Sequence, residues 1–283
     1  MLTSGSFLSR RGFLLATGGF LAGVAGTGVD AFDWATRRIQ ITAHEFPVRG
    51  LPAALAGLRI LQVTDVHLYQ GLHAAARRTM ELVAELRPDV TVITGDLVEN
   101  TGQLLELPPL LNACRGRLAT VAVMGNWEYQ AGVRPAELGE ICKTAGVTFL
   151  LNESLPVRVG DATLSVVGLD DTRRGDPDPD GALSEVGADD TVIWAFHAPW
   201  YADMLPRGRY PTPALAFAGH NHGGQIRPPL LPPLTPPGSG RFVEGLYRDT
   251  FAPLYVGRGI GTSGIRARFR CPPELPVFTL RAA

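Results

Sequence analysis

Gly219-His220-Asn221-His222-Gly223-Gly224-Gln225 places two imidazoles two positions apart on a short segment flanked by glycines. In an extended segment, residues i and i+2 point to the same side, which predicts that both rings face one site. The glycines let the backbone approach a bound anion closely. A pair of this kind occurs both in metal sites and in ordinary surface loops, so the rest of the chain has to distinguish the two.

The composition is that of a globular protein. Of the 283 residues, 45% are hydrophobic, which is enough for a sizeable buried core. The formal net charge of -1 gives no basic field, so nucleic acid is not predicted as a partner. Cys114, Cys142 and Cys271 are widely spaced and form no Cys-x-x-Cys pair. Neither a disulfide framework nor a zinc knuckle is indicated, and a single disulfide stays open.

Residues 1–31 are predicted to be an export signal and not part of the fold. Ser9-Arg10-Arg11-Gly12-Phe13-Leu14-Leu15 precedes an apolar run rich in glycine and alanine, which is the plan of a secretory signal. The paired arginines resemble the twin-arginine (Tat) signal, which directs folded proteins across the bacterial inner membrane. We therefore expect the Tat export machinery as a partner and an extracytoplasmic location, in the periplasm or cell envelope. Cleavage would follow Ala25 or Ala31, and an uncleaved signal would tether the protein to the membrane.

Residues 32–283 are predicted to form one domain in which strands and helices alternate, which indicates an α/β (α+β) fold. Strands are expected at 39–42, 58–63, 90–94, 118–124, 155–159, 163–169, 191–196 and 214–218, and helices at 73–86, 103–114 and 135–145. Five of these strands run into polar residues that can bind a metal ion: Asp65, His67, Asp96, Asn126, His197, His220 and His222. Ligands gather beyond the carboxyl ends of strands in open α/β sheets, so we expect these residues to meet.

The series resembles the five ordered motifs of calcineurin-like metallophosphoesterases. The matching motifs are Asp65-x-His67, Gly95-Asp96, Gly125-Asn126, His197 and Gly219-His220-x-His222, within about residues 58–226. The ending, with Tyr255 to Gly264 and then Pro272-Pro273-Glu274, resembles the exported bacterial branch of this superfamily. The resemblance implies a four-layer αββα sandwich with a dinuclear metal site at the carboxyl ends of the strands.

Carried over by position, the resemblance also implies the ligand sets. One ion would be held by Asp65, His67, Asp96 and His222, and the second by Asp96, Asn126, His197 and His220. Imidazole and carboxylate ligands suit manganese, iron or zinc. Two such ions about 3.5–4 Å apart can clamp both oxygens of an in-line displacement and turn a bridging water into hydroxide near neutral pH. Asp96, Asn126 and His220 are the residues we predict to be catalytic.

The sequence departs from the family pattern at Trp127, where the family usually has a histidine that stabilises the phosphate or protonates the leaving group. Indole donates a hydrogen bond but cannot supply a proton. Phosphodiesters or pyrophosphates, with their better leaving groups, are therefore favoured over alkyl phosphomonoesters. Trp127 either stacks on the substrate or packs under its loop. Glu128 is predicted to orient a ligand histidine.

Outside the motifs, Arg258 either binds a phosphate with its guanidinium or is an ordinary surface arginine, while Arg173 and Arg174 are expected to be solvated. Residues 228–240 contain too many prolines for a helix or a central strand. They form either a rim of the site or a stiff loop packed on the domain. As a rim, their leucines, Leu230, Leu231 and Leu234, would suit a lipid-bearing substrate or peripheral contact with a membrane.

The leading hypothesis from the sequence is an exported, dinuclear metal-dependent phosphoesterase. It would hydrolyse a phosphodiester or pyrophosphate in a phosphorylated small molecule or lipid of the envelope or cell wall, by attack of a metal-bridged hydroxide. A hydrolase resembling UDP-diacylglucosamine pyrophosphatase is an alternative that the apolar rim suits, although its cytoplasmic substrate conflicts with an export signal. A third alternative is a metal-containing binding protein that has lost turnover, which only Trp127 favours.

Overall fold

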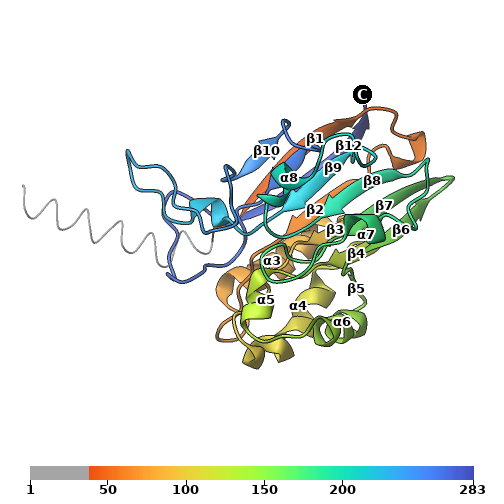
Figure 1. The fold of residues 1–283 in the computed structure, drawn as a ribbon. Helices are drawn as coiled ribbons and strands as arrows, with labels where there is room; N and C mark the ends of the chain where they lie inside the picture. Colours follow the sequence, from red (N-terminus) through yellow and green to blue (C-terminus); the bar gives the residue numbers. More distant parts are fainter. Residues whose placement is uncertain (1–37) are drawn as a thin grey trace, which may run out of the picture.

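Two six-stranded sheets lie face to face in the computed structural model, which describes residues 38–283 (Figure 1). The first sheet has the order β1-β12-β2-β3-β4-β5 and the second β10-β11-β9-β8-β7-β6. The first consists of β1 (Gln40–Val48), β2 (Arg59–Val63), β3 (Val90–Ile93), β4 (Ala119–Ala122), β5 (Thr148–Phe149) and β12 (Glu274–Ala282). The second consists of β6 (Glu153–Val159), β7 (Ala162–Gly168), β8 (Thr191–Ala195), β9 (Leu215–Ala218), β10 (Gly245–Tyr247) and β11 (Leu254–Val256).

Parallel pairing dominates the centre of both sheets. Strands β2, β3, β4 and β5 are parallel neighbours, and so are β7, β8, β9 and β11. Parallel strands place their carboxyl ends at the same edge of a sheet, so every loop that follows β2, β3 or β4 starts from one edge. The same holds for the loops after β8 and β9. Gln62 links the two sheets near this edge, since its amide nitrogen donates to the carbonyl of Ala218 at 2.8 Å.

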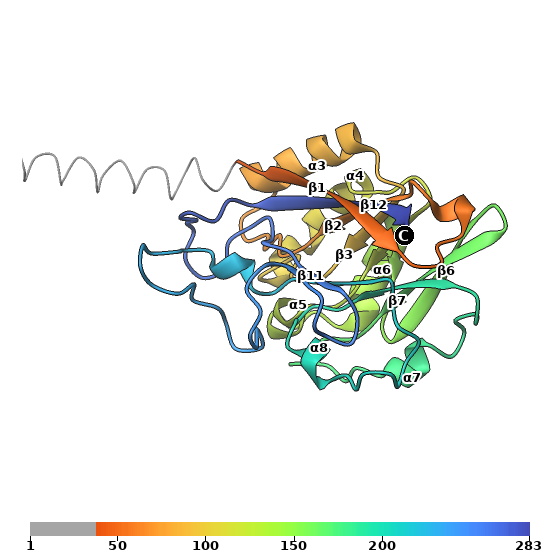
Figure 2. The same ribbon diagram turned by 90° about the horizontal axis from the view of Figure 1, so that it is seen from above.

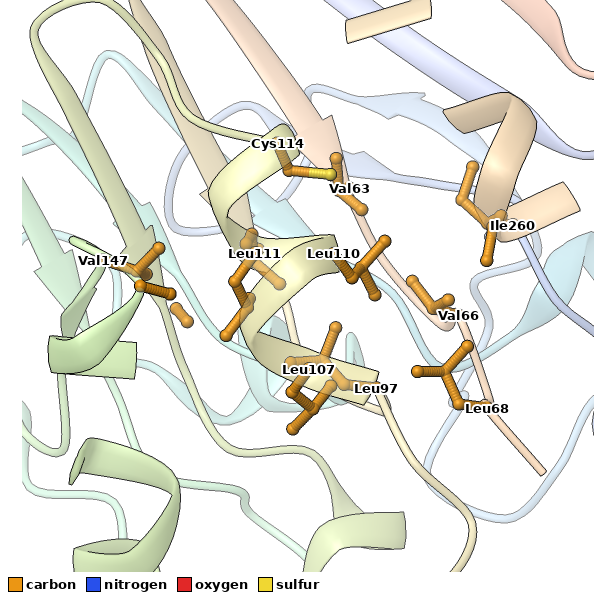
Figure 3. Packing of buried hydrophobic residues seen from close by; sticks show 14 of the residues in the cluster. Val63, Val66, Leu68, Leu97, Leu107, Leu110, Leu111, Cys114, Val147 and Ile260 are labelled. Atoms are coloured by element: carbon orange, nitrogen blue, oxygen red, sulfur yellow. The ribbon is translucent and has the colours of Figure 1, made fainter. Parts of the chain in front are cut away.

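Helices α3 (Ala74–Leu86), α4 (Leu107–Ala113) and α6 (Pro135–Thr144) cover the outer face of the first sheet. The ring of His73 caps α3 by accepting from the amide of Ala76, and Arg87, in the left-handed conformation before Pro88, ends it. Buried side chains of α4 pack against the strand ends and loops of the sheet (Figure 3); they include Leu107, Leu110 and Leu111, which share one cluster with Val63 and Val66.

Apolar side chains from both sheets fill the space between them. In β2, Ile60 belongs to this inner core, whereas the next residue, Leu61, faces the helices. Ile193 and Phe217 reach the same inner core from the second sheet. Because both faces of these strands are covered, they are mostly apolar and do not alternate, as is usual for buried parallel strands.

The outer face of the second sheet carries only short helices and loops. α7 (Pro179–Ala182) and α8 (Tyr201–Met204) lie on the side opposite α3 and α4 (Figure 2). Trp194 of β8 is fully buried there and packs against Phe251 with ring centroids 5.0 Å apart. The four-layer αββα expectation is thus confirmed, with a thin fourth layer.

Some predicted elements differ from the observed ones. The helix expected at 103–114 is a 3-10 helix, η3 (Thr101–Glu106), followed by α4. The sequence analysis did not predict β12, although it lies between β1 and β2 and is buried over most of its length. Pro276 lies within β12, although proline is disfavoured in a central strand. It is the partner of Thr42 in the parallel pairing of β12 with β1. The remaining short helices are η2 (Ala53–Leu55), α5 (Asn126–Gln130) and η4 (His222–Gly224).

The predicted export signal lies outside the described residues. Within residues 38–283, none of the helices has the length and apolar character needed to cross a membrane. The three cysteines are free and buried, so the disulfide left open by the sequence is not formed in this structure.

Candidate metal centre

The residues predicted as metal ligands follow five parallel strands and meet at one edge of the molecule. β2 leads to Asp65 and His67, β3 to Asp96, and β4 to the start of α5; β8 and β9 lead to the remaining histidines. All seven are buried: Asp65, His67, Asp96, Asn126, His197, His220 and His222. They form two clusters whose ligand atoms lie within 4.8 Å of one another in each cluster.

The first cluster contains Asp65, His67 and His222. The Nε2 atom of His222 lies 2.9 Å from Nε2 of His67 and 3.5 Å from Oδ1 of Asp65. Nε2 of His67 lies 3.9 Å from the same carboxylate oxygen. Two imidazole nitrogens and a carboxylate oxygen thus converge on one point, which is a donor set that suits a first-row divalent ion.

The second cluster contains Asp96, His197 and His220. Nε2 of His197 lies 3.1 Å from Oδ2 of Asp96 and 3.2 Å from Nδ1 of His220. Asn126 lines the same cavity as Asp96, and its buried side-chain oxygen has no hydrogen-bond partner. Buried amide oxygens are nearly always satisfied, so this free oxygen fits a ligand position on a metal ion.

Asp96 connects the two clusters. Its Oδ2 faces His197 and also lies 3.5 Å from Nε2 of His67 in the first cluster. Its Oδ1 accepts from the backbone amide of Trp127 at 2.8 Å. One oxygen is therefore fixed by the protein, and the other is directed between the two groups of ligands.

Polar contacts to the outer ring nitrogens orient the histidines of the two clusters. Nδ1 of His197 lies 2.7 Å from the carbonyl of Thr94, and Nε2 of His220 lies 2.9 Å from the carbonyl of Pro237. A carbonyl can only accept, so each of these nitrogens donates and leaves the other ring nitrogen as a lone-pair donor facing its cluster. For His67, Nδ1 lies 3.3 Å from the Glu99 carboxylate, and that carboxylate also forms an ion pair with Arg266.

In the second cluster the inward nitrogens of His197 and His220 therefore face each other with lone pairs at 3.2 Å. In the first cluster Nδ1 of His222 accepts from the Arg268 guanidinium at 3.3 Å, so its proton lies on Nε2, toward His67. Facing lone pairs repel unless a proton or a cation lies between them. The residues present thus fit the two metal ions that the donor set suggests.

The electrostatics of the clusters favour positive charge. Burial alone would lower the pKa of His67, but the neighbouring carboxylates outweigh it and raise the pKa to about 9. In the same way the pKa of His197 rises to about 10, mainly because of Asp96. Burial lowers the pKa of His222 to about 3 and that of His220 to about 4. The protein thus stabilises a positive charge at one histidine of each cluster, where a divalent ion would place its charge.

The backbone at the ligands is unusual. Asp65, His67, Asp96, His220 and His222 all have φ between 49° and 74°, the left-handed region. For residues other than glycine this costs about 1 kcal/mol each, and such strain concentrates at functional sites. From the sequence, extended segments with side chains of i and i+2 on one side were expected. That reason was wrong, because the two histidines of the 219–225 stretch turn away from each other and serve different clusters.

Glycines allow the ligand loops to approach one another. A Cβ at Gly219 would collide with the side chains of Thr64 and Asp65, and one at Gly125 would collide with Asp96. The amide of His220 donates to both oxygens of Asp65 at 3.0 Å. Residues 219–225 are thereby fixed to the first cluster through the backbone of His220 as well as the imidazole of His222.

Glu128 holds the Asp96 loop through its backbone. Its buried carboxylate accepts from the amides of Asp96 at 3.0 Å, Leu97 and Gly125 at 2.9 Å. Burial raises the pKa of this carboxyl. The expectation that Glu128 contacts a ligand histidine is not what the structure shows, since its partners are backbone amides of the two loops that carry Asp96 and Asn126.

Trp127 packs edge-on against His67, with ring centroids 5.5 Å apart, and forms part of a cavity of about 480 Å³ above the two clusters. The structure shows the packing alternative, and stacking on a substrate stays a prediction. Besides the ligands, the cavity is lined largely by apolar and small residues, among them Ile226, Pro228, Leu234, Pro236 and Ile265. A cavity of several hundred Å³ is the size that commonly binds a small molecule.

Arg173 is exposed, as expected from the sequence, and it also lines the cavity. It faces the cavity together with His220, and both side chains would crowd a Cβ placed at Gly238. Asp171 positions it by accepting from the amides of Arg173 and Arg174. This placement depends on the turn after β7, for which the sequence carries no distinct signal.

Arg258 does not line this cavity. Its guanidinium lies 3.3 Å from Glu274 and hydrogen-bonds Gln40 at 2.9 Å. It joins the C-terminal strand to the first strand, and the structure does not bring it to the clusters. The predicted alternative of a phosphate contact is therefore not supported by its position.

Facing sheets between helices, with two clusters of histidine and carboxylate at the strand ends, define an αββα sandwich with a candidate metal centre. A sequence profile described as calcineurin-like phosphoesterase matches residues 58–224, which include all seven ligand candidates. The chain belongs to the calcineurin-like phosphoesterase family. Membership implies divalent metal ions, and the two clusters are where the chain offers ligands for them.

Several proteins are similar over most of the chain. The uncharacterized metallophosphoesterase YkuE of Bacillus subtilis is 30% identical over 97% of this chain and 98% of its own. The phosphodiesterase YaeI of Escherichia coli is 27% identical over 96% of this chain and 99% of its own. A transmembrane protein with a metallophosphoesterase domain from Danio rerio is 29% identical over 86% of this chain, which spans 58% of that protein. These names support a phosphoester hydrolase.

Proposed function

We propose that this protein is an exported phosphodiesterase or pyrophosphohydrolase that works with two divalent metal ions. The observation that carries the proposal is the position of Asp96, whose Oδ2 lies 3.1 Å from Nε2 of His197 and 3.5 Å from Nε2 of His67. One carboxylate oxygen can thus serve two adjacent groups of ligands. The name phosphodiesterase given to the Escherichia coli relative supports the reaction class.

The ligand sets follow from the two clusters. Asp65, His67, Asp96 and His222 would hold one ion, and Asp96, Asn126, His197 and His220 the other. When bound, such a pair supplies an activated water and neutralises charge on a phosphate. Manganese, iron and zinc all suit nitrogen and oxygen ligands.

The chain's own residues fix these ligands before substrate arrives. Thr94, Pro237 and Glu99 contact the outer nitrogens of three histidines, and Glu128 holds the backbone of Asp96. A site whose polar groups are fixed in advance does not have to reorganise during the reaction. Of the catalytic residues we propose, Asp96, Asn126 and His220, all three line the cavity.

Arg173 is well placed to bind the non-reacting part of a phosphate. Its side chain lies beside His220 at the cavity wall. A guanidinium presents several donors in a fixed plane and matches two phosphate oxygens at once. We propose that Arg173 orients the phosphate, the role that the sequence analysis weighed for Arg258.

The residues that line the cavity favour diesters and pyrophosphates as substrates, because these residues limit protonation of the leaving group. Apart from the candidate ligands, Arg173 is the one ionisable residue among those lining the cavity in the described chain, and a guanidinium does not give up its proton. Trp127 occupies the position of the usual histidine and cannot replace it as an acid. Leaving groups that depart without a proton, such as phosphate or an acidic alcohol, therefore suit this site best.

Hydrolysis of bis(p-nitrophenyl) phosphate beside p-nitrophenyl phosphate tests this function. The purified protein, supplied with Mn²⁺, should turn over the diester and show little turnover of the monoester. The Asp96→Ala variant is the control and should lose diester turnover. Unchanged hydrolysis in this variant would exclude the proposed site, and metal binding without turnover of either ester would favour the metal-containing binding protein.

A hydrolase of a nucleotide-linked lipid, resembling UDP-diacylglucosamine pyrophosphatase, stays as a second candidate. It is favoured by one observation, the largely apolar wall of the cavity. Release of UMP from such a substrate, measured beside bis(p-nitrophenyl) phosphate hydrolysis, would distinguish it.

Export is a proposal that rests on the arginine pair at positions 10 and 11. Replacing both, Arg10→Lys with Arg11→Lys, should retain the protein in the cytoplasm, because the Tat machinery reads the arginine pair. Cell fractionation measures this directly. Normal export of the double variant would remove the proposed periplasmic location.

A further inference from the structure

Exposed apolar side chains gather at the mouth of the cavity. Leu230, Leu231, Leu234 and Ile265 are 104%, 64%, 76% and 57% exposed. They are half of the large exposed hydrophobic residues in the described chain. Leu234 and Ile265 line the cavity themselves. We refer to these four residues as the apolar rim. In Figure 1 the loop after η4 extends away from the two sheets.

The loop that carries the rim, residues 228–240, is attached to the metal centre at two places. Pro233 packs on Gly224, where a Cβ would come within 2.6 Å of it. The carbonyl of Pro237 contacts His220 at 2.9 Å. Leu230 lies near the start of the loop, before both attachments, and has a φ of 67°. A leucine in the left-handed region is strained, and its full exposure provides no packing within the chain to compensate.

The loop is suited to an apolar environment. It contains six prolines and no charged residue among its 13 positions. Proline has no backbone N–H, so almost half of its residues bring no backbone donor that would have to lose water. Unsatisfied backbone donors are a main obstacle to placing irregular chain in a lipid phase.

Arg270 is an exposed cation near the rim. Its segment joins that of Arg227 through a bridge between Ile226 and Phe269. The nearby Arg227 and Arg266 are paired with Glu244 and Glu99. The exposed guanidinium of Arg270 beside an apolar tip complements anionic lipid headgroups.

We propose that the apolar rim inserts into the surface of a bilayer containing anionic lipid and brings the phosphate of an amphiphilic substrate to the metal centre. This inference rests on the proposed function for the chemistry, but its membrane contact is independent of turnover. The apolar wall between the rim and the two clusters would accept the first part of a lipid chain, while Arg173 faces the phosphate. The substrate class is therefore a phosphodiester or pyrophosphate of a membrane lipid.

A fluorescent label on the rim tests the insertion. The full-length Leu231→Cys variant is labelled with nitrobenzoxadiazole, since the three native cysteines are buried. Vesicles of dioleoylphosphatidylcholine with dioleoylphosphatidylglycerol are then added. We expect a blue shift and quenching by doxyl groups in the acyl chains, both weaker without the anionic lipid. The control is Leu118→Cys, which is 49% exposed and precedes the amino end of β4, away from the strand ends that carry the site.

Two results would overturn the inference. One is a rim label whose emission is the same with and without vesicles. The other is a shift that depends on protein concentration in the absence of lipid, which would make a second copy of the chain the occupant. The local label also separates the rim from residues 1–37, which are identical in both variants.

A paired variant separates membrane contact from chemistry. Leu230→Ser with Leu231→Ser changes neither a ligand nor a lining residue. It should reduce binding to these vesicles at least about 10-fold, because two exposed leucines lose their apolar contact, and leave bis(p-nitrophenyl) phosphate hydrolysis unchanged. Leu118→Ser should change neither. If wild-type protein hydrolyses the diester but the leucine pair makes no difference to vesicle binding, the inference fails and the proposed function stands.

Discussion

The Nε2 atoms of His67 and His222 lie 2.9 Å apart, although the residues are separated by 155 positions in the chain. Glu99 contacts the other nitrogen of His67 at 3.3 Å, so Nε2 is the atom left to face the first cluster. Two inward nitrogens at this distance are compatible only with a proton or a cation between them. A divalent ion held between these nitrogens would contribute to the stability of the fold as well as to its chemistry.

Removal of metal should therefore destabilise the protein. Saturation at about 100 times Kd stabilises a folded chain by about 2.7 kcal/mol, which corresponds to about 5–10 °C in Tm for a domain of this size. Scanning calorimetry with and without a chelator measures the difference. In Asp65→Ala the chelator should have a smaller effect. Equal Tm values for wild-type protein in both conditions would show that the clusters hold no tightly bound ion.

Glu99 should contribute to metal affinity through His67. Its carboxylate lies between Nδ1 of His67 and Arg266, and loss of such an outer partner typically weakens metal binding about 10–100-fold. Competition of apo-Glu99→Gln with a chromogenic chelator measures the change. Glu81→Gln is the matched control, since Glu81 forms an exposed ion pair on α3. An affinity equal to that of the control would show that Glu99 has no such role.

Arg173 should affect binding of the anionic substrate. We expect Arg173→Ala to raise KM for the diester about 10-fold or more, because a charge-assisted pair to phosphate is lost, while the metal content stays the same. The neighbouring Arg174→Ala supplies the control, as Arg174 is exposed and does not line the cavity. Steady-state kinetics of both variants measure the two KM values. Equal KM values would assign Arg173 to the surface, as the sequence analysis first expected.

Trp127 should limit hydrolysis of monoesters. Trp127→His introduces a group that can protonate a leaving alcohol, and general acids contribute about 10²–10⁴-fold. We expect the ratio of monoester to diester turnover to rise by about 10-fold or more. Trp127→Phe keeps an aromatic ring next to His67 without adding an acid, and the ratio should not rise. A rise in both variants would mean that the size of the indole, and not the missing acid, restricts the substrate.

The meeting of the seven ligand candidates could be predicted because each follows a buried strand. Their distribution between two clusters came from the resemblance, not from the spacing. Spacing alone suggested that His220 and His222 share one side, which holds for an extended segment. Both residues have a left-handed backbone and lie in different clusters, and backbone strain of this kind has no simple signal in the sequence.

Other features depend on contacts that are distant along the chain. β12 was not predicted as a central strand, and Pro276 within it is a residue that such strands disfavour. The cavity position of Arg173 depends on the turn formed by Asp171, and that turn is braced by the hydroxyl of Tyr129, which donates to Asp170 at 2.7 Å. Single-residue preferences do not encode such tertiary positions.

Metal analysis of site variants tests the central claim most directly. Purified protein loaded with Mn²⁺ and passed through a desalting column is measured by plasma mass spectrometry. We predict two ions per chain for the wild type, one for His222→Ala and one for His197→Ala, because each variant removes a ligand from a different cluster. A single ion in the wild type, or two ions retained in both variants, would contradict a dinuclear centre built on these residues.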